Sequence, residues 1–148
     1  MGNQHRVLPQ RLWSMNYLLD TNALKARITK DAHFIKQIQT KNPSELMISE
    51  MTEHEVLFGI ACNPKSRLPT VVESMLCLLP KLAIGLNEAA LAADIRADLK
   101  SRGLPIGPHD VLIADAVLAM DLIIIITHST RKFSRMPGLL MEDWQFSA

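Results

Sequence analysis

Four short apolar runs recur along the chain. They are YLLD at residues 17–20, ELMIS at 45–49, LAIGL at 82–86 and LIIIIT at 122–127. Continuous apolar runs of this length are typical of strands that are buried on both faces of a sheet. The last run is also rich in β-branched residues, so it is predicted to be a central parallel strand.

The segments between these runs carry helix signals. In residues 29–41, Phe34, Ile35 and Ile38 fall on one helical face. Thr29 is the predicted N-cap of this helix. Further helices are predicted at 51–61, at 68–79, at 87–103 with Asn87 as its cap and Gly103 past its end, and at 111–120. Strands that alternate with helices predict an α/β fold with a central parallel sheet.

Composition agrees with one globular domain and excludes several other classes. The chain has 148 residues, of which 48% are hydrophobic and 21% charged, and this usage argues against disorder. A net charge of +1 excludes a polycation that holds nucleic acid by bulk charge, so contact with RNA or DNA requires a local patch. The apolar run 122–126 is far too short to span a bilayer.

Two parts of the chain are expected to carry no chemistry. Residues 1–14 are polar and basic without periodicity, and we predict an N-terminal extension there, with the domain at 15–148. Cys62 and Cys77 lie among apolar neighbours and lack metal-ligand spacing. They are predicted to be structural thiols of a cytoplasmic protein.

Polar residues close to the predicted strands are the first candidates for a functional site, because ligands of open parallel sheets bind beyond the carboxyl ends of the strands. Asp20 follows the first strand, Glu55 lies in the helix after the second, and Asp110 opens the buried helix before the last. Thr127, His128 and Ser129 follow that last strand.

The three carboxylates are predicted to converge and to bind a cation. Clustered carboxylates repel one another, and a fold that gathers them usually offsets the repulsion with a positive ion. Oxygen donors of this kind suit Mg²⁺ or Mn²⁺, which activates water and stabilises a phosphodiester transition state. The predicted reaction is metal-dependent phosphodiester hydrolysis.

Each candidate also has a purely structural interpretation. Asp20, Thr21 and Asn22 are equally typical of a helix cap and turn. Glu55 fits a solvated helix face, and Asp110 fits the N-cap of the following helix. Asp115 is five residues beyond Asp110, which places it on a different face of that helix.

The basic residues after the last strand are open to two interpretations as well. They are ordinary surface charges, or they form a patch that grips phosphate. These residues are Arg131, Lys132 and Arg135.

Four stretches, taken in order, closely resemble the PIN-domain ribonucleases of the VapC toxin family. They are YLLDTN, ISEMTEHEVLFG, IRADLKSRGLPIGPHDVLIADAVLA and LIIIITHSTRKFSRMPGLLMEDW, and the similarity runs from about Met15 to Trp144. The resemblance implies an α/β/α sandwich, an acidic site that binds Mg²⁺ or Mn²⁺, and endonucleolytic cleavage of RNA. It further implies a VapB-type antitoxin, a homodimer, and most similarity to members that cut initiator tRNA.

The resemblance also assigns roles to individual residues. Asp20, Glu55 and Asp110 match the acids of the family motif, with Asp20 and Asp110 as the expected metal ligands. Thr21 and Asn22 match the polar residues that support the first acid, and Thr127 and Ser129 are further supporting candidates. The family usually has Asn or Asp at the position of Ser129, so this chain departs from the pattern there. Reduced metal affinity and reduced turnover are hypotheses that follow from this departure.

Three functions are therefore considered. The first is an RNA endonuclease toxin that uses Asp20, Glu55 and Asp110. The second is a catalytically weakened PIN domain that acts by binding RNA and antitoxin. The third is a metal-independent component of a DNA complex, against which the intact set of three acids argues.

Overall fold

The computed structural model describes residues 16–63, 65, 70–83, 86–120 and 123–145. The described strands form one sheet in the order β3-β2-β1-β4-β5, and every neighbouring pair is parallel. They are β1 (Asn16–Leu19), β2 (Leu46–Ser49), β3 (Lys81–Leu82), β4 (Ile123–Ile126) and β5 (Leu140–Glu142). The predicted parallel sheet, with the isoleucine-rich strand in its interior, is confirmed.

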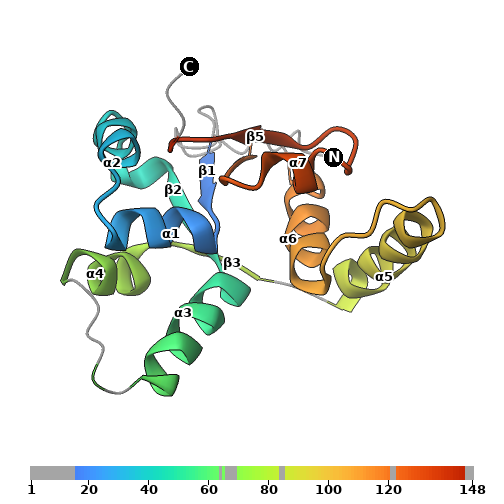
Figure 1. The fold of residues 1–148 in the computed structure, drawn as a ribbon, viewed down its shortest axis with the longest axis horizontal. Coiled ribbons are helices and arrows are strands. Elements are labelled where there is room, and N and C mark those ends of the chain that lie inside the picture. The colour runs from blue at the N-terminus through green and yellow to red at the C-terminus, as the bar shows by residue number, and fades with distance from the viewer. Residues whose placement is uncertain (1–15, 64, 66–69, 84–85, 121–122, 146–148) are drawn as a thin grey trace, which may run out of the picture.

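Helices cover both faces of this sheet (Figure 1). They are α1 (Thr21–Ile28), α2 (Ala32–Gln39), α3 (Glu50–Cys62), α4 (Thr70–Leu78), α5 (Leu86–Ser101), α6 (Pro108–Leu118) and α7 (Thr130–Phe133). In Figure 1, α1, α2 and α4 lie on one side of the strands, and α5 and α6 lie on the other. The domain is therefore the predicted α/β/α sandwich.

Two apolar clusters, one on each face, explain why the interior strands β1 and β4 are largely apolar. Leu18 and Ile125 belong to the cluster under α5 and α6, whereas Leu19 and Ile126 belong to the cluster under α1, α2 and α4. All four side chains are at most 1% exposed. Successive strand residues point to opposite faces, so a strand covered on both faces buries each of its side chains.

The strand register brings the ends of β1 and β4 together. Leu19 pairs with Ile48 of β2 on one side and with Ile126 of β4 on the other. The next backbone N–H, that of Asp20, still donates to the carbonyl oxygen of Ile126 at 3.2 Å. Asp20 and Thr127 therefore leave the sheet side by side.

The prediction for residues 21–41 was wrong in its details. Residues 21–28 form α1, a helix that was not predicted, and Thr29 ends it instead of capping the next one. Asp31 caps α2, since its Oδ1 accepts the N–H of Phe34 at 2.9 Å. The buried residues of α1 are Ala23, Leu24 and Ala26. Two of them are small alanines and the spacing is irregular, so the sequence shows no helical periodicity of apolar residues there.

Other boundaries also differ from the predicted ones. The strand expected at 82–86 is β3 at Lys81–Leu82, and residues 84–85 lie outside the described part of the chain. Asn87 lies inside α5, whereas Gly103 follows that helix at φ 73° as predicted. The short elements α7 and β5 were not predicted, because three or four residues are too few for a periodic signal.

The two cysteines are not buried structural thiols. Cys62 and Cys77 are both free and exposed. Their apolar neighbours misled the prediction, because Phe58 and Leu78 are themselves 62% and 80% exposed. Within the described residues, no helix has the length and apolar character required to traverse a membrane.

Trp144, in the EDW stretch, has a structural role. It is 3% exposed, and its ring lies 5.4 Å from that of Tyr17 and 5.8 Å from that of Phe34, between centroids. Its indole Nε1 donates to Glu142 Oε2 at 2.9 Å. The side chain thus ties the end of β5 to β1 and α2, which explains this motif by packing.

Candidate active site

Asp20 is a buried carboxylate at the junction of β1 and α1. It is the N-cap of α1, and its Oδ1 accepts the N–H of Ala23 at 2.9 Å. Burial, which leaves 6% of the residue exposed, raises its pKa to about 6, although a hydrogen bond with Thr127 opposes the shift. Asp20 therefore does cap α1. Its carboxyl group lies where burial disfavours the charged form.

Glu55 is held between two hydrogen-bonding groups. Its Oε2 accepts from the Thr21 hydroxyl at 2.7 Å, and its Oε1 lies 2.9 Å from His109 Nδ1. Partial burial raises the pKa of Glu55, but the hydrogen bonds from Thr21 and His109 outweigh it and leave the pKa below its ordinary value. Glu55 is therefore an oriented, ionised carboxylate.

Asp110 lies in the first turn of α6. The N-cap of this helix is Gly107, so the predicted capping role of Asp110 was wrong. Its Oδ2 lies 2.7 Å from Lys132 Nζ. A β-carbon on Gly107 would meet this oxygen at 3.2 Å, so the glycine leaves the space in which the carboxylate sits.

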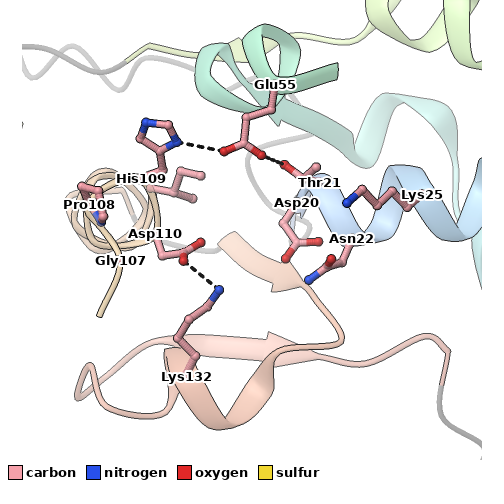
Figure 2. Close-up of a pocket in the computed structure, with 11 residues that line it drawn as sticks. Asp20, Thr21, Asn22, Lys25, Glu55, Gly107, Pro108, His109, Asp110 and Lys132 are labelled. Carbon is pink, nitrogen blue, oxygen red and sulfur yellow. Dashed lines mark hydrogen bonds and ion pairs between the residues drawn. The ribbon is translucent and has the colours of Figure 1, made fainter. Parts of the chain in front are cut away.

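One pocket of about 300 Å³ brings the three predicted acids together (Figure 2). It opens beside the carboxyl end of β1, between α1, α3 and α6. Its lining residues are Asp20, Thr21, Asn22, Lys25, Glu55, Gly107, Pro108, His109, Asp110, Ile113 and Lys132. The expected convergence of Asp20, Glu55 and Asp110 is therefore found.

The chemistry of the donors fits a hard cation held by two carboxylates. Asp20 and Asp110 are close enough that the charge of Asp110 adds to burial in raising the pKa of Asp20. Among the described residues, no three His, Cys, Asp or Glu side chains are grouped closely enough to hold one ion. Mg²⁺ is commonly bound through one or two carboxylates with several waters, so this pair suits it.

Comparisons with known proteins decide the family. A family model, "PIN domain", matches residues 17–139. The tRNA(fMet)-specific endonuclease VapC of Salmonella typhimurium is 32% identical over 132 residues, which cover 88% of this chain and 98% of that protein. This chain belongs to the VapC family of PIN-domain ribonucleases. The enzyme of the same name from Shigella flexneri is 31% identical with the same coverage.

Solved structures agree with this family. The DNA-bound VapBC of Salmonella typhimurium has a TM-score of 0.70 and 31% identity, covering 88% of this chain and 98% of that chain. VapBC2 of Rickettsia felis, bound to a promoter DNA fragment, has a TM-score of 0.71 at 24% identity, with 88% and 99% covered. The second likeness speaks for the fold alone.

Ser129 is connected to the site through Asn22. The amide Nδ2 of Asn22 donates to Ser129 Oγ at 3.0 Å. The backbone N–H of Ser129 donates to Thr127 Oγ1 at 2.9 Å. Ser129 does not line the pocket. It contributes indirectly, by accepting a hydrogen bond from Asn22, which does line it. His128 is exposed, and its Nδ1 lies 2.9 Å from Asp143 Oδ2.

The basic residues after β4 separate into three environments. Lys132 reaches into the pocket and pairs with Asp110, whereas Arg131 is exposed. Arg135 donates to the backbone carbonyl of Pro105. The three residues therefore have different partners, and RNA contact by them stays a prediction.

Sequence reasoning missed several residues that line the pocket. His109 and Gly107 lie within the GPHD loop that pointed to Asp110, so their proximity was the available signal. Lys25 gave none, because its helix was not predicted. Asp115, expected on a separate helix face, is only 7% exposed and lies outside the pocket.

Proposed function

We propose that this chain is the toxin of a type II toxin–antitoxin pair and cleaves RNA internally with a divalent metal ion. The observation that carries the proposal is the convergence of Asp20, Glu55 and Asp110 from three separate segments onto one pocket. A carboxylate is buried there at a cost, since its pKa is raised to about 6 by burial. A cation at this position offsets that cost.

Asp20 and Asp110 would hold the ion, with Mg²⁺ or Mn²⁺ as the proposed species. When bound, such an ion activates water and neutralises charge on the phosphodiester. Asp20 contributes its carboxylate from a rigid position, because capping fixes it to the first turn of α1. Asp110 contributes from the first turn of α6, where the helix dipole favours a negative side chain.

Glu55 is the proposed proton acceptor for the attacking water. Its lowered pKa keeps it ionised at neutral pH, although it also makes Glu55 a weaker base than a carboxylate with a raised pKa. The Thr21 hydroxyl and the His109 ring hold one oxygen each, so the carboxylate cannot rotate freely. A general base must be both ionised and oriented, and Glu55 meets both conditions.

The substrate and partners are proposed from the relatives. The Salmonella typhimurium and Shigella flexneri enzymes are named for tRNA(fMet), and we propose tRNA as the substrate class here. The DNA-bound VapBC complex of Salmonella typhimurium supports a VapB-type antitoxin as the partner, and we propose that it covers the pocket. A homodimer is proposed as well, and light scattering of the purified toxin tests it.

A catalytically weakened PIN domain is the second candidate. One observation favours it: Lys132 already pairs with Asp110, one of the two proposed metal ligands. Such a protein binds RNA and antitoxin but turns over slowly. The measured cleavage rate separates the two candidates.

Removal of the metal is expected to stop RNA cleavage. Purified protein is incubated with bacterial tRNA in Mg²⁺, in Mn²⁺ and in excess chelator, and the products are resolved on denaturing gels. Cleavage is expected with either metal and not in chelator. The Asp98→Asn variant should cleave like wild type and serves as a control. Asp98 is an exposed residue of α5 that pairs with Arg102 outside the pocket. Cleavage that persists in chelator would contradict the proposal.

Metal binding is expected to weaken as the pH falls below about 6. Asp20, with a pKa of about 6 in the metal-free protein, takes up a proton in that range, and the proton competes with the ion. The apparent affinity should fall about tenfold per pH unit below this value and level off above it. Mn²⁺ titrations between pH 5 and pH 8 measure this dependence. A flat profile would show that Asp20 is not a ligand.

A further inference from the structure

The Lys132 ammonium is the nearest counter-charge to the acid pair of the pocket. Its Nζ lies 2.7 Å from Asp110 Oδ2, with the two side chains 35% and 27% exposed. Its charge also acts on Asp20, where burial and Asp110 raise the pKa and Lys132 opposes them. Figure 2 shows the lysine rising from α7 toward Asp110, on the side of the pocket away from Glu55.

The backbone that carries Lys132 is anchored, whereas its side chain is 35% exposed to solvent. The next residue, Phe133, is fully buried in the cluster under α5 and α6. The N–H of Lys132 donates to the carbonyl oxygen of Ser129 at 3.2 Å. From this anchored position, a four-carbon stem with a compact ammonium group reaches the pocket. The backbone position of Lys132 therefore places its ammonium group at the pocket, and the partly exposed side chain can adopt other rotamers.

Gly107 leaves free the space beside Asp110 Oδ2, because a β-carbon there would approach this oxygen to 3.2 Å. The oxygen pairs with Lys132 and belongs to a carboxylate that the proposed function assigns to the metal. An ammonium ion and a divalent cation compete for it.

We propose that Lys132 is an internal counter-ion of Asp20 and Asp110, which a divalent ion must displace from Asp110 in order to bind. This inference rests on the proposed function and adds a regulatory property to it. The lysine lowers the metal affinity of the site, so that cleavage responds to the concentration of free divalent ions. It also screens the repulsion between the two acids in the metal-free protein.

The test measures binding of Mn²⁺ alone, without RNA. Free Mn²⁺ is followed by electron paramagnetic resonance during titration of wild type, Lys132→Gln and Lys132→Arg. Removing one partly exposed ion pair should tighten binding about 3- to 10-fold in Lys132→Gln. Lys132→Arg keeps the charge, and its affinity should stay close to that of wild type.

Lys25→Gln is the matched control. Lys25 lines the same pocket and loses the same charge, but its charge acts on Glu55. Its effect on Mn²⁺ affinity should be clearly smaller than that of Lys132→Gln. Equal tightening in the two glutamine variants would overturn the specific role of Lys132 and point to net charge alone.

The remaining outcomes separate this inference from the proposed function. If wild type binds Mn²⁺ and Asp20→Asn does not, but Lys132→Gln binds no more tightly than wild type, the counter-ion inference alone is wrong. If neither wild type nor Lys132→Gln binds Mn²⁺, both proposals are wrong. Circular dichroism of each variant shows that the fold is retained.

Discussion

Asp20→Asn is expected to abolish RNA cleavage and, at the same time, to stabilise the metal-free protein at neutral pH. Cleavage should fall ~10³-fold or more, because a ligand of the proposed metal is lost. The stability gain follows from burial, which raises the pKa of Asp20 from 3.8 to about 6. A neutral amide of the same shape still accepts the N–H of Ala23 and carries no buried charge.

The sign and the size of this gain follow from linkage. A carboxyl group whose pKa is higher in the folded state contributes stability below about pH 4, and this contribution is lost as the pH rises through 6. The shift of ~2 pKa units corresponds to at most ~3 kcal/mol. Because the amide must also be desolvated, we expect a gain of about 1 to 3 kcal/mol at pH 7.5 and little difference near pH 4.

Urea unfolding in chelator, at pH 4 and pH 7.5, measures this difference. Asp98→Asn serves again as the control, because its carboxylate is exposed and its removal should leave stability nearly unchanged. An Asp20→Asn protein that is less stable than wild type at pH 7.5 would contradict the buried-charge argument. Retained cleavage would contradict the assignment of Asp20 to the site.

Asp110→Asn is expected to cause a comparable loss of cleavage without a gain in stability. Its carboxylate is partly exposed and already neutralised by Lys132, so no buried charge is relieved. The lost ion pair and the lost interaction with the dipole of α6 together cost about 1 kcal/mol. Cleavage should nevertheless fall ~10³-fold, because the second proposed metal ligand is gone.

The contrast between the two variants is the informative result. Cleavage assays and urea unfolding are carried out on both in parallel, with Mn²⁺ titration as a third measurement. Both should lose Mn²⁺ binding, yet only Asp20→Asn should become more stable. Full Mn²⁺ affinity in Asp110→Asn would remove Asp110 from the proposed metal site.

Much of the fold could be predicted from local patterns. Apolar runs such as LIIIIT mark strands because a strand between two helical layers buries every side chain. The parallel order then places Asp20 and Thr127 at one edge of the sheet, as the register of β1 and β4 confirms. The elements that were missed, α1, α7 and β5, are short or lack a periodic apolar face.

The GPHD loop illustrates where a local signal misleads about a role. The sequence suggested Asp110 as an N-cap, but Pro108 occupies the first helical position and Gly107 becomes the cap. Asp110 is thereby moved inside the first turn, with its carboxylate free to point into the pocket. Sequence reasoning identified the residue but not its position in the helix.

The sequence by itself determined the alternation of strands and helices, the VapC-family membership and the three acids of the site. Each of these depends on residue type, local periodicity or the order of motifs along the chain. Only the tertiary structure decided which partner each acid has: Thr21 and His109 for Glu55, and Lys132 for Asp110. These pairings join separate segments, so they depend on how helices dock against the sheet and not on any local pattern.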